Sequence, residues 1–422
     1  MIDYVKIIAD KIKAGIPVAF YTVGGDTFSV MRALKHRFGV KPVAVCDRDV
    51  AKQGRAYRGL DGVPVMSFEE TDSRFPNAEY FISSMDYRFN IMGELVSGNK
   101  IQADRILNWE PLEKRKSCIF FEKSIFVKSN GDLIFCCVPG SPTVKFNTDT
   151  VQCANDFLKL RNELIQFCTS GKLSSPCKTC GYLIEGWYPH KPSSWWINWF
   201  AFGTCNFKCA YCASSALAPQ DIKDPLMFKE TINAFKETGM LSDFYSIILS
   251  TSGEPTLNPN KKDFFDSFDG HGLVVNTNGS IFDQELFDLM QEKFVRLIVS
   301  LDAGTRETYS KIKGVDCLEK VHKNLKRYSE SAVGLVVPKY IVMPGVNDND
   351  ADADGFVASC DDLDVQYAII AYDQNGIVPI PQNSAHTMRK IKSALESLNI
   401  LCVPYTPYET YEYVAALNGI LS

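Results

Sequence analysis

The sequence predicts an α/β protein whose main part is a partial (βα)6 barrel. Two further parts precede the barrel: an amino-terminal α/β module and a small cysteine-rich domain. Three observations predict this arrangement. Strand and helix patterns alternate over residues 1–108, a hairpin pattern with clustered cysteines occupies 109–190, and six strand–helix units fill 191–400. We assign residues 401–422 to a carboxyl-terminal tail.

Composition excludes several classes of protein. Of the 422 residues, 45% are hydrophobic and 23% are charged, which is typical of folded chains. The net charge of −5 provides no broad basic surface, so general nucleic-acid binding is not expected. No apolar stretch approaches the roughly 20 residues that a membrane span needs. The first residues also lack the apolar core of a signal peptide, so we expect a cytoplasmic protein.

The amino-terminal module carries features of a nucleotide-binding half-fold. Its first apolar run ends in Gly24-Gly25 and its second in Asp47, and a glycine turn followed by an acid suits such a fold. The third glycine of the dinucleotide fingerprint is absent, so a structural or generic ligand module is favoured over dinucleotide binding. With the stretches 46–49 and 59–65, this start resembles Rossmann-like modules attached to enzymes of surface-polysaccharide and sugar-nucleotide modification.

The second segment is set apart by its cysteines. The chain has 14 of them, with seven between Cys118 and Cys180. In a reducing compartment, clustered cysteines more often bind metal or do redox chemistry than form disulfides. The runs 124–128 and 133–137 flank an Asn-Gly pair, which predicts a β-hairpin. A helix is expected over 155–167.

The third segment predicts a sheet of parallel strands. Its strand runs cover 195–202, 244–249, 273–277, 296–301, 335–343 and 366–371, and helical patterns lie between them. Six such units suggest a sheet curled into a partial TIM-like barrel. In sheets of this kind, ligands bind at the carboxyl ends of the strands.

The sharpest chemical signal directly follows the first of these strands. Cys205, Cys209 and Cys212 are spaced C-x3-C-x2-C. Three thiolates in one short loop can hold three irons of a [4Fe–4S] cluster, which usually takes four cysteines, and so leave one iron open to a ligand. The alternatives are a zinc knuckle or buried cysteines, but zinc usually recruits a fourth Cys or His at a defined spacing.

With the aromatic Tyr211 before its third cysteine, this loop resembles the cluster motif of the radical S-adenosylmethionine (radical SAM) superfamily. The resemblance implies a [4Fe–4S] cluster with S-adenosylmethionine on its open iron. It also implies that the Gly-Glu-Pro segment after the second strand receives the methionine amino group, and that polar strand ends reach the ribose and the carboxylate. The residues implied in cofactor binding are Tyr211, Gly253, Glu254, Pro255, Asn276, Asn278, Ser300, Asp302 and Lys339.

A second cysteine group resembles the auxiliary-cluster (SPASM and twitch) domains of the same superfamily. Cys118 and Cys136 flank the hairpin turn at Gly131, and Cys177 and Cys180 form a C-x2-C pair. Four thiolates fit a second, fully ligated [4Fe–4S] cluster. A zinc ribbon with four cysteine ligands remains open, as does Cys137 in place of Cys136. The group also departs from the family pattern, because it precedes the barrel and because the remaining Cys137, Cys153 and Cys168 do not complete the pattern of a further cluster.

The resemblance implies an enzyme that abstracts hydrogen from a substrate C–H bond by means of a 5′-deoxyadenosyl radical, in an oxidoreductase or lyase type of reaction. It also implies an electron-donating reductase such as flavodoxin or ferredoxin. The amino-terminal module favours a sugar or sugar-nucleotide substrate. The alternatives are a peptide-modifying maturase and a non-catalytic iron–sulfur electron carrier. No catalytic side chain is assigned, because the cofactor carries the hard chemistry.

Overall fold

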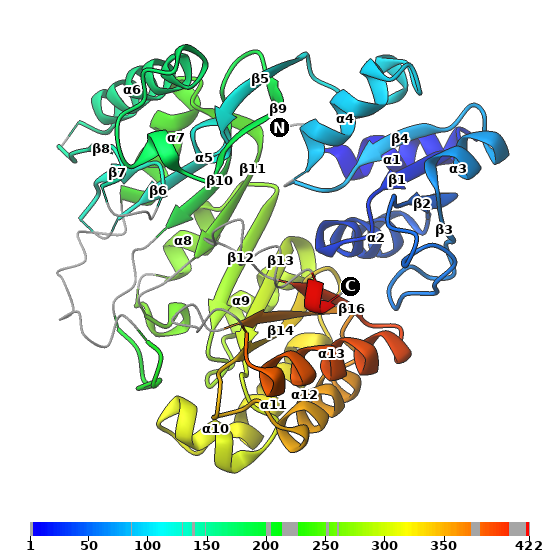
Figure 1. Ribbon diagram of the computed structural model, residues 1–422, viewed down its shortest axis with the longest axis vertical. Helices are drawn as coiled ribbons and strands as arrows, with labels where there is room; N and C mark the ends of the chain where they lie inside the picture. The colour runs from blue at the N-terminus through cyan, green and yellow to red at the C-terminus, as the bar shows by residue number, and fades with distance from the viewer. Residues whose placement is uncertain are drawn as a thin grey trace.

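The computed structural model describes residues 3–85, 87–128, 130–136, 140–147, 149–199, 204–212, 227–249, 253–259, 261–372, 380–404 and 419–421. A four-stranded sheet forms the amino-terminal module and a ten-stranded sheet forms most of the remainder (Figure 1). In the described part of the chain, no helix is both long enough and apolar enough to cross a membrane.

The amino-terminal module is a parallel sheet in the order β3-β2-β1-β4. Its strands lie where the apolar runs predict them. Side-chain caps begin two of its helices, with Asp3 accepting from the Lys6 amide and Ser67 from the Glu70 amide. The elements are α1 (Tyr4–Lys13), β1 (Val18–Tyr21), α2 (Gly25–Phe38), β2 (Ala44–Cys46), β3 (Val65–Met66), α3 (Phe68–Arg74), β4 (Glu79–Ile82), α4 (Arg88–Ser97) and η1 (Ala103–Arg105).

The cysteine-rich segment contains the expected hairpin and an antiparallel ribbon that the sequence pattern did not indicate. The ribbon pairs β5 with β9, with Cys118 opposite Leu183. The helix expected over 155–167 is longer at both ends, because Asp149 caps its start and Gly171, in the left-handed region, ends it. The elements are β5 (Leu112–Cys118), α5 (Ile119–Lys123), β6 (Ser124–Val127), β7 (Leu133–Ile134), β8 (Thr143–Val144), α6 (Thr150–Ser170), η2 (Cys177–Thr179) and β9 (Leu183–Pro189).

All six expected barrel strands are present, and the sheet extends beyond them at both ends. It runs β16-β15-β14-β13-β12-β11-β10-β6-β7-β8 without closing, and it is parallel from β16 to β6. The hairpin of the cysteine-rich segment therefore continues the barrel sheet through β6. The strands are β10 (Ser194–Trp199), β11 (Leu241–Leu249), β12 (Gly272–Thr277), β13 (Phe294–Ser300), β14 (Leu335–Val342), β15 (Tyr367–Tyr372) and β16 (Leu401–Pro404).

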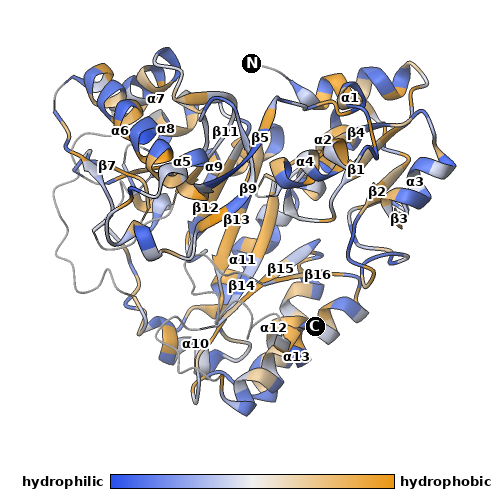
Figure 2. Cartoon of the chain, turned by 45° about the horizontal axis from the view of Figure 1, so that its top comes forward, coloured by the Kyte–Doolittle hydropathy of each residue, from blue (hydrophilic) through white to orange (hydrophobic). Residues whose placement is uncertain are grey.

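Helices cover the outer face of this sheet. The outward side chains of its central strands are buried against these helices in the largest apolar cluster, and Figure 2 shows apolar strands flanked by amphipathic helices. The helices are α7 (Met227–Glu237), η4 (Pro255–Leu257), α8 (Lys261–Ser267), α9 (Gln284–Glu292), α10 (Arg306–Lys313), α11 (Leu318–Ser329), α12 (Asp350–Asp362) and α13 (Gln382–Ser397). The four tail tyrosines, Tyr405, Tyr408, Tyr411 and Tyr413, lie outside the described residues.

The amino-terminal module packs against the inner face of the ten-stranded sheet, toward the amino-terminal ends of its strands. Leu335, Val337 and Tyr367 share one apolar cluster with α1, α2 and β1. The Phe28 ring stacks on Tyr367 at 6.0 Å, and Arg296 on β13 pairs with Asp26 at 3.0 Å. These inward side chains lie toward the amino-terminal ends of their strands. The module therefore fills the end of the barrel opposite to the strand ends that carry the cysteine loop.

Gly25 is required by this packing. A Cβ at Gly25 would lie 2.7 Å from the Tyr367 hydroxyl, whereas one at Gly24 would meet only the Thr22 hydroxyl at 4.0 Å. We expect Gly25→Ala to lower the free energy of unfolding by about 1–3 kcal/mol, the usual cost of overpacking. Urea unfolding with Gly24→Ala as control measures this, and Tyr367→Leu should restore part of the loss. Equal stability of the two alanine variants would contradict the close approach.

Candidate active site

The cysteine loop is held by backbone hydrogen bonds at the carboxyl edge of the sheet. The Glu254 amide donates to the Thr204 carbonyl at 2.8 Å, which joins the loop to the end of β11. On its other side, the Ala210 amide donates to the Ile312 carbonyl at 2.8 Å, at the end of α10. The loop is thus attached to two units of the sheet that are far apart in sequence.

The three loop thiols lie close enough to affect one another's ionisation. Burial raises the pKa of Cys205 and Cys209, and the charge of Cys212 raises both further. Within the described residues, no three His, Cys, Asp or Glu side chains gather tightly enough to share a single metal ion. A [4Fe–4S] cluster would take these three thiolates on separate irons.

Glu254 is fully engaged within the protein. Its side chain is buried, and one carboxylate oxygen accepts from the hydroxyls of Thr256 and Thr277 at 2.8 and 2.7 Å. The other oxygen accepts from the Asn278 amide at 2.7 Å. Burial raises the pKa of Glu254 despite these donors. The carboxylate therefore joins the ends of β11 and β12. A ligand at this segment would meet the backbone of Gly253, Glu254 and Pro255.

Asn278 connects the end of β12 to the cysteine loop. Its amide nitrogen lies 2.9 Å from the Asn206 oxygen and 3.9 Å from the Cys205 sulfur. The Asn206 amide in turn donates to the Ser280 hydroxyl at 2.9 Å. Asn278 therefore contacts a predicted cluster ligand, in addition to the cofactor-binding role that the resemblance implies.

Asp302, which the resemblance implies among the residues that reach S-adenosylmethionine, is engaged within the protein. It is fully buried, and its carboxylate accepts from the Tyr211 hydroxyl at 2.6 Å, the Lys313 amine at 2.5 Å and the Ile341 amide at 2.8 Å. Both oxygens are engaged by the protein. Asp302 thus anchors the aromatic residue of the cysteine loop to β13 and β14. The same contact holds the Tyr211 ring by its hydroxyl group, and burial raises the pKa of that hydroxyl well above its ordinary value.

The upper inner face of the barrel remains partly accessible. Inward side chains near the carboxyl ends of β12, β13 and β14 are only partly covered, among them Asn276, Ser300 and Lys339. Ser300 lies opposite Lys339 in the strand register. Within the described residues, no hydrogen bond or ion pair engages the Lys339 amine. Burial lowers the pKa of Lys339, and the nearby Asp302 opposes that shift.

The second cysteine group lines one small, largely apolar cavity. All four predicted ligands border it, namely Cys118, Cys136, Cys177 and Cys180. Cys137 lies outside the described residues. Burial raises the pKa of Cys118 to about 12 and that of Cys177 to about 11, so bound metal would be needed to hold them as thiolates. Four thiols around an apolar cavity fit a second [4Fe–4S] cluster.

The nucleotide-binding features of the amino-terminal module are used within the protein. Asp47 is buried, and its carboxylate accepts from the Val23 amide at 2.9 Å and from Lys52 at 3.3 Å. Asp26, at the start of α2, accepts from the Met85 amide at 3.2 Å and pairs with Arg296. These contacts occupy the acid that a bound nucleotide would need. The geometry favours the structural interpretation of the module over dinucleotide binding.

The sequence pattern did not single out Lys313, Thr277 or Arg161. Lys313 stands in the last turn of a charged helix, where a lysine is ordinarily solvent-exposed. Its side chain is 1% exposed, and only the folded structure places its amine against Asp302. No periodic signal could have found it.

A parallel α/β sheet with a three-cysteine loop at its carboxyl edge is an arrangement that suits an iron–sulfur protein. A family model described as the radical SAM superfamily matches residues 200–356. The chain therefore carries a radical SAM domain, which binds a [4Fe–4S] cluster and S-adenosylmethionine.

Curated relatives share this domain. A GTP 3′,8-cyclase of Crocosphaera subtropica is 27% identical over 165 residues, which is 35% of this chain and 47% of the relative. A probable GTP 3′,8-cyclase of Saccharolobus islandicus is 31% identical over 141 residues, 32% of this chain and 43% of the relative. The chain thus spans about half the length of the curated relatives it matches.

Among solved structures, SuiB of Streptococcus suis bound to its precursor peptide SuiA is similar with a TM-score of 0.43 and 12% identity, over 73% of this chain and 75% of that one. A radical SAM methyltransferase from Sphaerobacter thermophilus has a TM-score of 0.38 and 18% identity, over 50% and 66% of the two chains.

Proposed function

We propose that this protein is a radical SAM enzyme that abstracts hydrogen from a C–H bond of an anionic small molecule of the nucleotide or sugar-nucleotide type. The proposal of radical chemistry rests on one observation: a backbone hydrogen bond joins the cysteine loop to the Gly-Glu-Pro segment. Cys205, Cys209 and Cys212 would hold a [4Fe–4S] cluster, which in its reduced form would supply the electron for cleavage of S-adenosylmethionine and so for abstraction of the substrate hydrogen.

The chain's own residues hold the parts in place. Glu254 and Asn278 fix the ends of β11 and β12 beside Cys205, and Asp302 fixes Tyr211. The amino-terminal module covers the amino-terminal end of the barrel and keeps water from entering there. These contacts preorganise the loop before any ligand binds, so little reorganisation is needed at the moment of reaction.

Lys339 supports an anionic substrate. Its side chain lies on the partly accessible inner face and makes no hydrogen bond or ion pair within the described residues, so its amine can meet an anion there, with the charge of Asp302 nearby. The relatives whose names specify GTP as substrate agree with a phosphate-bearing molecule. The S-adenosylmethionine carboxylate is a second anion that the amine could meet.

We expect Lys339→Met to weaken binding of the anion about 10- to 100-fold, the value of a charge-assisted hydrogen bond of roughly 1.5–3 kcal/mol. Anaerobic titration with GTP, UDP-glucose and S-adenosylmethionine separates the two sources. Weaker binding of a nucleotide alone supports the substrate role, and weaker binding of S-adenosylmethionine alone assigns the amine to the cofactor. Unchanged affinity for all three would remove Lys339 from the site.

The auxiliary site supports electron transfer. Cys118 precedes β6 and Cys136 follows the antiparallel β7, so both lie at the amino-terminal edge of β6. The cysteine loop follows the carboxyl end of β10, the parallel neighbour of β6 (Figure 1). The auxiliary cavity therefore lies at the amino-terminal ends of these two strands and the loop at their carboxyl ends. This separation favours electron transfer over direct ligation of the substrate.

The test of the proposal is anaerobic incubation of reconstituted protein with dithionite and S-adenosylmethionine. Release of 5′-deoxyadenosine is expected, and a non-catalytic electron carrier would release none. In deuterated candidate substrates, transfer of deuterium to 5′-deoxyadenosine would identify the abstracted position. Protein with a full complement of iron that never cleaves S-adenosylmethionine would exclude the proposed activity.

A further inference from the structure

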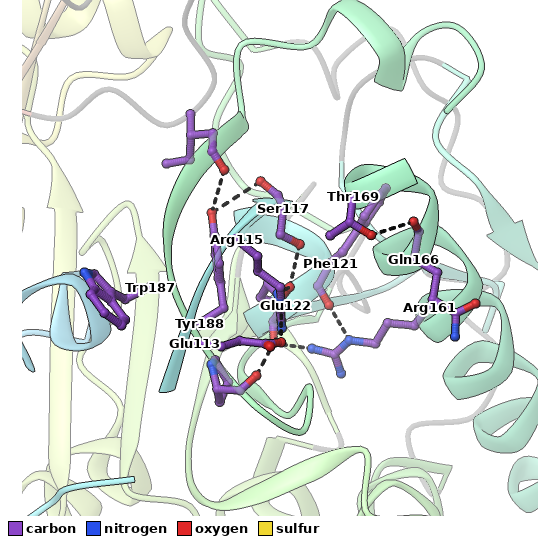
Figure 3. A network of polar contacts seen from close by, with 12 residues as sticks. Glu113, Arg115, Ser117, Phe121, Glu122, Arg161, Gln166, Thr169, Trp187 and Tyr188 are labelled. Carbon is purple, nitrogen blue, oxygen red and sulfur yellow. Dashed lines mark hydrogen bonds and ion pairs between the residues drawn. The ribbon is translucent and has the colours of Figure 1, made fainter. Parts of the chain in front are cut away.

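Arg161 is an unusual residue because its guanidinium group is fully buried. It lies on α6, where Nε donates to the Phe121 carbonyl and Nη2 to the Glu122 carbonyl (Figure 3). The third nitrogen, Nη1, has no hydrogen-bond partner among the described residues. Burying a charged group costs several kcal/mol unless it is compensated, so the position calls for a physical reason.

The two carbonyls belong to α5, the short helical turn that begins directly after Cys118. At the start of this turn, the backbone amides of Phe120 and Phe121 act to lower the pKa of the Cys118 thiol, against the larger raising effect of burial. The Phe120 and Phe121 side chains also border the four-cysteine cavity. Arg161 therefore holds the far end of the turn whose near end contacts a cluster ligand.

The charges around this turn leave an excess of positive charge. Glu122 is buried and accepts from both terminal nitrogens of Arg115 and from the Ser117 hydroxyl. Two arginines thus face one buried carboxylate, since the other acid on Arg115, Glu113, is half exposed. Burial lowers the pKa of Arg161 to about 10, so the guanidinium stays protonated at neutral pH.

We propose that Arg161 is a positioning residue for the auxiliary site, which fixes the turn that follows Cys118 and supplies a buried positive charge at the far end of that turn. The proposal rests on the auxiliary cluster of the proposed function. A cluster held by four thiolates is an anion, and its reduction potential depends on nearby charge and on hydrogen bonds to its sulfurs. Arg161 acts on both quantities, through its charge and through the amides of the turn it holds.

The experiment isolates the auxiliary cluster in a variant with Cys205, Cys209 and Cys212 changed to alanine. In that background, iron content and the midpoint potential from an EPR-monitored redox titration are compared for Arg161→Met, Arg161→Lys and Glu122→Gln. Arg105→Met serves as the control, since Arg105 also donates to a backbone carbonyl, that of Ala78 at 2.9 Å, but belongs to the amino-terminal module.

We expect Arg161→Met to shift the midpoint potential to a more negative value and to lower iron content. Glu122→Gln removes a negative charge and should shift the potential the opposite way. Arg161→Lys should stay closer to the unmodified background, and Arg105→Met should not change it. If Arg161→Met does not fold, Glu122→Gln alone decides: a shift of the midpoint potential to a more positive value supports the proposal, and an unchanged potential contradicts it.

Two failures are distinguishable. If the background variant holds no iron, the auxiliary cluster itself is absent and that part of the proposed function fails. If the background holds about four irons, the content of one cluster, but neither Arg161→Met nor Glu122→Gln moves the potential, the role of Arg161 is wrong.

Discussion

Cys209→Ala is expected to abolish release of 5′-deoxyadenosine and to lower iron content from about eight atoms per chain to about four, since two [4Fe–4S] clusters are expected and one would be lost. Cys209 is the middle cysteine of the loop and is partly buried beside Lys313 and Asp302. Without its thiolate, the cluster would be left with two protein ligands, too few to hold it.

The measurement is iron and acid-labile sulfide content after anaerobic reconstitution, with 5′-deoxyadenosine quantified by chromatography. Cys317→Ser is the matched control. Cys317 is also partly exposed, but it stands at the N-cap of α11, where serine is a favoured residue. We expect that variant to keep its iron and its activity. An active Cys209→Ala variant would mean that the loop does not hold the catalytic cluster.

Cys177→Ser is expected to have the complementary effect. Cys177 borders the auxiliary cavity, so its loss should lower iron content to about four atoms per chain while the loop cluster remains. Cleavage of S-adenosylmethionine with dithionite should then persist, although turnover of substrate is lost. Elemental analysis of this variant would favour the zinc-ribbon alternative if it showed a loss of zinc and not of iron.

Much of the fold could be predicted because its signals are local. Apolar runs marked the strands from β10 to β15, and an Asn-Gly pair marked the hairpin of β6 and β7. The ribbon of β5 and β9 escaped prediction since its strands pair residues about seventy positions apart and β5 contains an uninterrupted charged run, residues 113–116. Likewise, nothing local indicates that β6 joins β10, so the continuous sheet was not foreseen.

The parts of the site that depend on a fixed spacing of cysteines could be predicted. Three cysteines in one loop and a C-x2-C pair are local patterns, and the cavity bordered by Cys118, Cys136, Cys177 and Cys180 agrees with the second group. The role of Asp302 was not predictable, because a polar residue at a strand end looks the same in sequence whether it faces a ligand or a buried lysine. Which of the two occurs depends on Lys313, which tertiary packing brings from α10.

Lys313→Met is expected to lower the free energy of unfolding by about 3–5 kcal/mol, because it leaves a fully buried carboxylate without its cation. The side chains of Lys313 and Asp302 are 1% and 0% exposed, so water cannot replace the lost partner. The double variant Asp302→Asn with Lys313→Met removes both charges and should recover a large part of the loss. Urea unfolding of the single and double variants gives the coupling free energy of the pair.

The same pair should also control the cysteine loop, since Asp302 and Lys313 both contact the Tyr211 hydroxyl, at 2.6 and 2.9 Å. Tyr211→Phe removes only that hydroxyl, so we expect a stability loss of about 1 kcal/mol, the net value of one hydrogen bond. If the pair positions the loop, the double variant should be stable but cleave S-adenosylmethionine slowly. A double variant that regains both stability and full activity would show that the ion pair serves folding alone and that the loop does not depend on it.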